Sequence, residues 1–159
     1  LGRTSAMFFG DHEAAFANLA RATKPGGRLV LLVWQGFGDN EWIRCILGAM
    51  AAGRELPPPP PGAPGPFSLS EPARVRELLT GAGFAEPQLH DVREPMYLGA
   101  TADEAIAFMH GLNAWMVRDV DEATRVRALD ALARTMREHE GPDGVTFDSA
   151  TWLVTATRA

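Results

Sequence analysis

Side chains that could act as nucleophiles, general bases or metal ligands are sparse in this sequence. The four histidines, His12, His90, His110 and His139, are dispersed and show none of the spacing typical of a metal site. No Ser-His-Asp arrangement, G-x-S-x-G turn or H-E-x-x-H helix occurs. His110 lies near the apolar face of a predicted helix, where a structural or surface role is favoured over that of a base or an acceptor-orienting group. We therefore predict that the chain binds no metal.

The single cysteine, Cys45, lies in the apolar helical pattern WIRCILGAM. One cysteine cannot form an intrachain disulfide. In such a pattern a buried, inert thiol is favoured over a nucleophile.

Composition and charge narrow the class of protein. The chain has 159 residues, of which 46% are hydrophobic and 22% are charged, and its formal net charge is −5. This length suits one compact domain, and the acidic balance argues against general attraction to nucleic acid phosphates. No apolar run approaches the roughly 20 residues that span a bilayer, and no signal peptide pattern occurs. We expect a cytoplasmic protein with neither a nucleic acid nor a membrane as partner.

The stretch KPGGRLVLLVW, from Lys24 to Trp34, organises the predicted fold. Pro25 ends a preceding helix, and the two glycines after it permit a tight reversal. The apolar run from Leu29 to Val33 does not alternate, which favours a strand covered on both faces. Upstream, Asp11 can cap a helix from His12 to about Thr23. The apolar stripe predicted for this helix consists of Ala15, Phe16, Leu19 and Ala22. Together these elements predict one step of a doubly wound α/β sheet.

Further elements follow from capping, turn and periodicity signals. Ser68 with Glu71 and Thr101 with Glu104 form two predicted capping boxes, and Asp121 caps a further helix. The five prolines at 57–61 favour a linker over a ligand for a proline-recognition domain. The predicted helices are 40–52, 68–83, 101–118 and 122–139, and the predicted strands are 86–92, extended by 96–98, and 151–157.

Three ordered segments resemble a known family. MFFGDHEAAFANLARATKPGGRLVLLVWQ resembles the middle of class I S-adenosylmethionine-dependent methyltransferases, near the ubiquinone and menaquinone biosynthesis type. GPFSLSEPARVRELLTGAGFAEPQLHDV resembles the next helix and sixth strand, and GVTFDSATWLVTATR the seventh strand. The resemblance implies an α/β fold, namely the C-terminal half of a doubly wound Rossmann-like methyltransferase sheet with an antiparallel last strand. Residues 1–159 would form a partial methyltransferase domain, with a helical lid insertion at 100–140.

The resemblance also implies a strand order. The strand at Leu29–Trp34 should pair with the strand at Thr151–Thr157 in an antiparallel manner. The latter strand should lie between Leu29–Trp34 and the strand at Glu86–Val92. The two helices of the lid should form an antiparallel pair, because only a few residues connect them.

The cofactor implied by the resemblance is S-adenosyl-L-methionine, bound by the full-length protein. Leu1 to Met7 resembles the end of the family's fourth strand, so Arg3, Thr4 and Ser5 are the implied cofactor-binding residues. The implied substrate pocket contains Met7, Phe8, Trp34, Met109 and Trp115. For Met7 and Phe8 packing below the sheet is favoured over a pocket wall, whereas for Trp34 the two roles are even. Met109 and Trp115 belong to an apolar stripe for which core packing between these helices and the sheet is favoured over a substrate-facing wall. The stripe consists of Ala105, Phe108, Met109, Leu112, Trp115 and Met116.

Two hypotheses on function remain. The first is methyl transfer to a small, apolar acceptor by a longer protein that contains this chain. The family's Gly-rich turn and its acidic residue on the second strand have no counterpart here, and no G-x-G-x-x-G occurs. We therefore expect the isolated chain to be inactive, and to dimerise or aggregate through an uncovered sheet edge. The second hypothesis is a non-catalytic binding or oligomerisation module that has lost the donor-binding half.

Overall fold

The computed structural model describes residues 1–57, 60 and 63–159. The chain divides into two compact units. Unit 1 comprises Leu1–Asp39, Pro59–Arg93 and Ala150–Ala159, and unit 2 comprises Asn40–Pro58 and Glu94–Ser149. Each unit is described by itself below. Most of the predicted proline linker at 57–61 lies outside the described residues.

Unit 1 is built on a four-stranded sheet with the order β1-β2-β7-β3. Its strands are β1 (Gly2–Arg3), β2 (Arg28–Trp34), β7 (Ala150–Thr157) and β3 (Gln88–Arg93). β1 runs parallel to β2, whereas β7 is antiparallel to both β2 and β3, with Leu31 opposite Val154. The predicted placement of the last strand between the two others is therefore confirmed.

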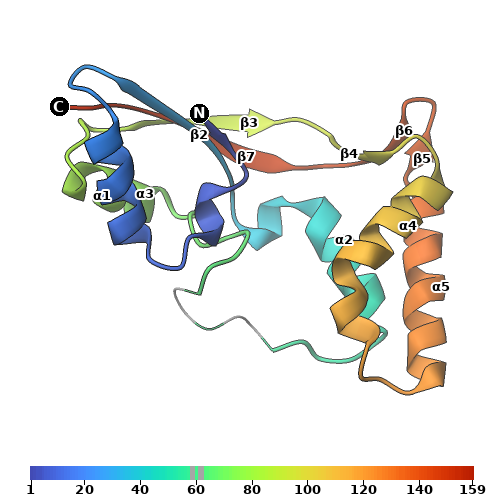
Figure 1. The fold of residues 1–159 in the computed structure, drawn as a ribbon. Helices are drawn as coiled ribbons and strands as arrows, with labels where there is room; N and C mark the ends of the chain where they lie inside the picture. Colours follow the sequence, from blue (N-terminus) through green and yellow to red (C-terminus); the bar gives the residue numbers. More distant parts are fainter. Residues whose placement is uncertain (58–59, 61–62) are drawn as a thin grey trace. The chain divides into compact units, whose positions relative to one another are not determined.

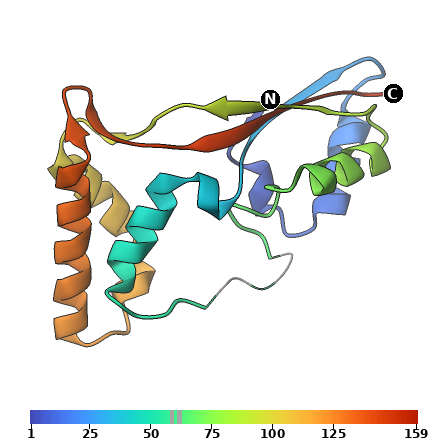
Figure 2. The ribbon, with the colours of Figure 1, turned by 180° about the vertical axis from the view of Figure 1, so that it is seen from behind.

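The faces of β2 are buried unequally. Leu29, Leu31 and Val33 are buried, but Val30 and Leu32 on the other face are only half-buried. In unit 1, α1 (His12–Ala22) and α3 (Pro72–Gly81) lie side by side against one face of the sheet (Figures 1 and 2). The expectation of a strand fully covered on both faces is therefore wrong for the described residues. A doubly wound sheet carries helices on both faces, and unit 1 supplies them on one.

The start of α1 follows the sequence prediction, because the carboxylate of Asp11 accepts a hydrogen bond of 2.9 Å from the backbone N–H of Ala14. Its buried side is formed by His12, Phe16 and Ala20. The other members of the predicted stripe around Phe16 lie to one side of this face. Ala15 and Leu19 are half-buried, and Ala22 is exposed.

The predicted capping box of Ser68 and Glu71 is wrong. The Ser68 hydroxyl donates instead to the backbone carbonyl of Met7, at 2.6 Å. Helix α3 begins at Pro72, and its N-cap residue Glu71 makes no side-chain cap hydrogen bond. Pro72 suits the first turn of a helix because its missing N–H would have no intrahelical partner there.

Unit 2 combines a small antiparallel sheet with helices. The sheet has the order β4-β6-β5, and its strands are β4 (Met96–Gly99), β6 (Gly144–Phe147) and β5 (Glu140–Gly141). Since β4 pairs with β6, the expectation that 96–98 would extend the strand before it is wrong. The helices are α2 (Glu41–Ala51), α4 (Ala102–Asn113), the 3₁₀ turn η3 (Ala114–Val117) and α5 (Glu122–Glu138).

Helices α4 and α5 begin as predicted. Thr101 accepts from the backbone N–H of Glu104, and Asp121 accepts from that of Thr124 at 2.8 Å. The two helices lie side by side and run in opposite directions, as expected from their short connection (Figures 1 and 2). Helix α4 ends at Asn113, so the last turn of the predicted helix is 3₁₀ instead. No helix among the described residues is long and apolar enough to cross a membrane.

Candidate functional site

The carboxyl ends of β1 and β2 form one edge of the sheet in unit 1. The two strands run parallel, so the residues that follow them meet at the same edge, where open α/β sheets bind ligands. The predicted cofactor-binding residues Arg3, Thr4 and Ser5 lie here. The backbone N–H of Thr4 donates to the carbonyl of Leu32 at 2.9 Å.

Thr4 has a backbone conformation that is unusual for its residue type. Its φ of 50° lies in the left-handed region, which a β-branched residue seldom adopts. This turn directs the chain out of the sheet and into the 3₁₀ helix η1 (Ala6–Phe8). Strained backbone of this kind is concentrated at ligand sites, although it also occurs in turns.

Three of the predicted substrate-pocket residues, Met7, Phe8 and Trp34, belong to unit 1. Met7 is fully buried, with 0% of its surface exposed, whereas Phe8 is 54% exposed. Trp34 is 9% exposed at the end of β2. The Met7 side chain therefore packs in the interior of the unit, and Phe8 is the residue of the three that offers an open apolar surface.

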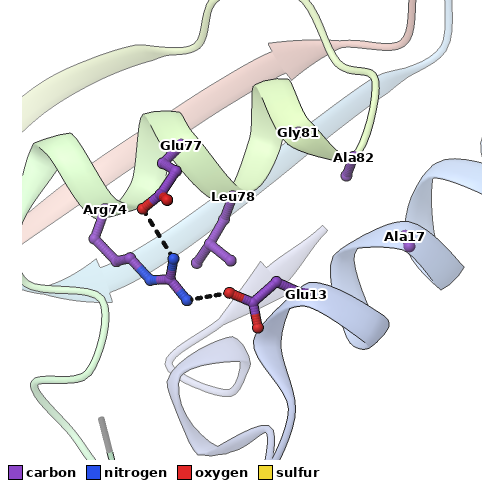
Figure 3. A pocket seen from close by; sticks show the side chains of 7 residues that line it. All are labelled: Glu13, Ala17, Arg74, Glu77, Leu78, Gly81 and Ala82. Carbon is purple, nitrogen blue, oxygen red and sulfur yellow. Dashed lines mark hydrogen bonds and ion pairs between the residues drawn. The ribbon is translucent and has the colours of Figure 1, made fainter. Parts of the chain in front are cut away.

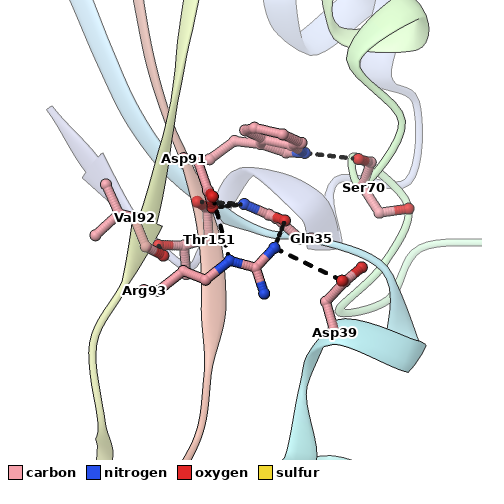
Figure 4. A network of polar contacts seen from close by, with 8 residues as sticks. Gln35, Asp39, Ser70, Asp91, Val92, Arg93 and Thr151 are labelled. Atoms are coloured by element: carbon pink, nitrogen blue, oxygen red, sulfur yellow. Dashed lines mark hydrogen bonds and ion pairs between the residues drawn. The ribbon is translucent and has the colours of Figure 1, made fainter.

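A polar network occupies the sheet beyond Trp34 (Figure 4). The side-chain amide of Gln35, which is 4% exposed, donates to Asp91 at 2.5 Å and to the carbonyl of Thr151 at 3.0 Å. The Arg93 guanidinium donates to the Gln35 amide oxygen and to Asp91, both at 3.2 Å. Arg93 also lies 3.7 Å from the carboxylate of Asp39, in the 3₁₀ turn η2 (Phe37–Asp39).

Hydrogen bonds within this network favour the charged forms of Asp91 and Arg93. The hydrogen bond from Gln35, followed by that from Arg93, holds the pKa of Asp91 below its usual range. Hydrogen bonding to Asp91 in turn raises the pKa of Arg93. A carboxylate held in its ionised form by two donors is a poor general base, so the network is better suited to holding polar groups in place.

Sequence reasoning missed this network. Asp91 and Arg93 are two residues apart in β3, so they lie on the same face of the strand. Gln35 follows directly after β2. The residues pair only because β7 lies between β2 and β3, and that neighbourhood is a property of the whole sheet.

The other two predicted pocket residues, Met109 and Trp115, belong to unit 2. Met109 is 1% exposed and packs inside the unit, whereas Trp115 is 62% exposed. Phe108 and Leu112 are exposed as well, at 55% and 60%. We refer to Phe108, Leu112 and Trp115 as the open apolar stripe. The expectation that the whole stripe would be interior is therefore wrong for these three residues.

A separate pocket of about 340 Å³ lies in unit 1, between α1 and α3 (Figure 3). Arg74 crosses it and pairs with Glu13 at 2.5 Å and with Glu77 at 2.9 Å. Because two carboxylates already neutralise this guanidinium, the pocket has little attraction for an anion. None of the predicted site residues lines it.

Comparison with known proteins shows a similarity of fold alone. No family model matches this chain, and no curated protein matches it either. Among solved structures, the YcgJ protein from Bacillus subtilis superposes with a TM-score of 0.50 and 13% sequence identity. The similarity covers 98% of this chain but only 61% of that protein. The chain therefore has a mixed α/β fold like that of the YcgJ protein and spans less than two thirds of its length.

Proposed function

We propose that this chain is the C-terminal part of a class I methyltransferase, which transfers a methyl group from S-adenosylmethionine to a small, apolar acceptor. The observation that carries the proposal is the strand order β1-β2-β7-β3, with antiparallel β7 between β2 and β3. The resemblance of three ordered sequence segments implies this order. Local patterns of hydrophobicity do not specify it.

Methyl transfer requires few specific side chains from the protein. Methyl transfer from a sulfonium needs the acceptor atom to be held in line with the methyl group. A general base is required only if the acceptor must lose a proton. Phe8 in unit 1 offers an exposed apolar surface of the kind that suits an apolar acceptor, and the open apolar stripe of unit 2 separately offers another.

The residues at the carboxyl edge do not make a complete donor site. Arg3, Thr4 and Ser5 offer one arginine and two hydroxyl groups. The backbone N–H groups of a Gly-rich turn and an acidic partner for the ribose would have to come from outside this chain. Each hydrogen bond contributes roughly 0.5–1.5 kcal/mol, or about 1.5–3 kcal/mol when one partner is charged. The loss of several would weaken donor binding by orders of magnitude, because about 1.4 kcal/mol is a factor of ten.

A second candidate function is a non-catalytic binding or oligomerisation module. Two features favour it. β1 pairs with β2 only at Leu31 and Leu32, so β2 has no partner strand along Arg28–Val30 on that side in the described part of the chain. Open strand edges and exposed apolar residues both favour association with a second copy.

The experiment compares two lengths of protein. One is the chain of 159 residues, and the other also contains the segment encoded upstream of Leu1. Calorimetric titration with S-adenosylmethionine should show binding only in the longer protein, and light scattering should show a dimer or larger species for the shorter one. Absence of donor binding by the longer protein, or a stop codon just upstream, would favour the non-catalytic module.

A pair of arginines supplies a matched control in the longer protein. Arg3 lies at the carboxyl edge of the sheet, whereas Arg28 begins β2 at the opposite end. Both side chains are exposed. Arg3→Ala should weaken donor binding, and Arg28→Ala should leave it unchanged. Equal effects of the two substitutions would argue that the donor does not bind at this edge.

A further inference from the structure

Three side chains with metal-binding chemistry meet in unit 2. Glu41 and Cys45 are one helical turn apart on α2, so they share a face of that helix. His139 caps the C-terminal end of α5. One ligand atom from each of the three residues lies within 4.8 Å of the other two, and the Glu41 carboxylate is 3.8 Å from His139 Nε2.

The orientation of His139 is set by its neighbours. Its Nδ1 lies 2.8 Å from the carbonyl oxygen of Thr135. Since a carbonyl only accepts hydrogen bonds, Nδ1 carries the proton, and Nε2 has a free lone pair when the ring is neutral. The ring also stacks on Phe147, with a centroid distance of 3.9 Å and an angle of 17°. A histidine that donates from one nitrogen to a carbonyl and presents the other is the usual arrangement of a metal ligand.

Glu41 is anchored in a similar way. Its Oε2 accepts a hydrogen bond of 2.9 Å from the backbone N–H of Asp148. Its Oε1 faces His139. The two ligands therefore each have an outer hydrogen bond that holds the ligand atom toward a common point, as carboxylate and histidine ligands do in metal sites.

We propose that Glu41, Cys45 and His139 form a binding site for a borderline-soft divalent transition metal, of which Zn²⁺ is the representative ion. The ligand set of one thiolate, one imidazole and one carboxylate suits zinc and is unsuited to Mg²⁺ or Ca²⁺, which prefer oxygen ligands alone. Three protein ligands leave a fourth position of the tetrahedron for water or another small ligand.

The distances require only a small adjustment. Ligand atoms around a tetrahedral zinc ion are about 3.5 Å apart, as follows from metal–ligand bonds of about 2.0–2.3 Å. The separation of 3.8 Å between Glu41 and His139 is already close to this value. Cys45 must approach its partners by up to about 1 Å, which a change of side-chain rotamer can supply. The side chains of His139 and Glu41 are 24% and 33% exposed, so an ion can reach them from solvent.

An ion at this position would link α2 to the end of α5, two elements that are distant in the sequence. The site lies within unit 2 and does not depend on the proposed methyl transfer. The sequence alone predicts no metal because His139 lies far along the chain from Glu41 and Cys45.

The test uses the chain after treatment with a chelator. Titration with Zn²⁺ should show one site per chain, and Co²⁺ should produce the near-ultraviolet charge-transfer band of a cobalt thiolate. Cys45 is the only cysteine, so protection of the chain from a thiol reagent by Zn²⁺ reports on this residue alone. Mg²⁺ should give no protection.

Substitutions separate this site from adventitious binding. Loss of a residue that only hydrogen-bonds to a metal ligand typically lowers metal affinity by about 10–100-fold. Loss of a ligand itself should cost at least as much, so Zn²⁺ affinity should fall roughly tenfold or more in each of three variants. These are Cys45→Ser, His139→Gln and Glu41→Gln. His110→Gln, an exposed histidine of the same unit, is the matched control and should bind as the parent does. Circular dichroism would verify that each variant is folded. Unchanged Zn²⁺ affinity in folded Cys45→Ser, or loss of protection by His110→Gln, would overturn the proposal.

Discussion

Alanine substitutions at two positions of α4 can show how much of its apolar surface is covered in solution. Met109 and Leu112 are three residues apart and similar in size, but they are 1% and 60% exposed respectively. Truncation of each to alanine removes a comparable apolar group from the same helix. The difference between the two variants in free energy of unfolding therefore reports on burial, because helix propensity changes little in either case.

The expected magnitudes differ clearly. Met109→Ala removes a buried side chain and leaves a cavity, which costs about 2–5 kcal/mol. Full burial of a leucine contributes about 1.5–3 kcal/mol, and Leu112 buries about two fifths of its surface, so Leu112→Ala should cost about 0.6–1.2 kcal/mol. In urea, with a slope of about 2 kcal/mol per M, a loss of 3 kcal/mol moves the midpoint by about 1.5 M.

The assay is urea unfolding of the two variants and the parent, followed by circular dichroism. Midpoint shifts of equal size would refute the reasoning, because Leu112 would then have to be covered in solution. Repetition at several protein concentrations distinguishes the causes. A concentration-dependent shift for Leu112→Ala would identify a second copy as the cover, in line with the oligomerisation module.

Three further predictions concern unit 2. Gly144→Ala should destabilise the protein by about 2–5 kcal/mol, the sum of a left-handed penalty and overpacking. The reason is that φ of Gly144 is +94° and a Cβ would lie 2.5 Å from the carbonyl oxygen of Gly99. Gly48→Ala in α2, with open space around it, should instead stabilise the protein by about 0.5–1 kcal/mol, as urea midpoints would show. Hydrogen bonds from Thr124 lower the pKa of Asp121 in the folded protein. The stability that this cap contributes is therefore present above the pKa of an aspartate in the unfolded chain, about 3.9, and is lost as the pH falls through the lower pKa of the folded state. Asp121→Asn keeps a capping oxygen, and its acid unfolding curve should be flatter than that of the parent; identical curves would contradict the assignment. Amide hydrogens in α4 and α5 should exchange faster than those of β2 and β7, as in a lid, and slower exchange in the helices would count against that role.

Local signals predicted the local structure well. Asp11, Thr101 and Asp121 each cap the helix that the sequence assigns to them, because a cap depends on residues within one turn. Ser68 shows the limit of such signals. Its hydroxyl has a partner from a distant part of the chain, the carbonyl of Met7, and that contact replaces the cap.

Features that depend on distant neighbours were predicted poorly. Periodicity identified a broad apolar stripe over 105–116 but not which side of it the neighbouring elements would cover. Core packing was favoured for the stripe as a whole, yet Leu112 and Trp115 are exposed. The network of Gln35 with Asp91 and the cluster of Cys45 with His139 unite residues from separate elements. The position of β7 in the sheet was predicted, but from the resemblance to a family and not from the periodicity of its residues.

The place of β7 in the sheet has a consequence for synthesis on the ribosome. Residues of unit 2 end at Ser149, so this unit can fold before Ala150–Thr157 is translated. The sheet of unit 1 cannot close until β7 has been made, since β7 separates β2 from β3 and pairs with both. Pairing across such a long stretch of chain is slow, because the entropy of closing the loop is lost before the contacts form. Throughout that interval β2 and β3 lack a partner on the edges that will later pair with β7. These edges are what a chaperone would need to shield from mispairing.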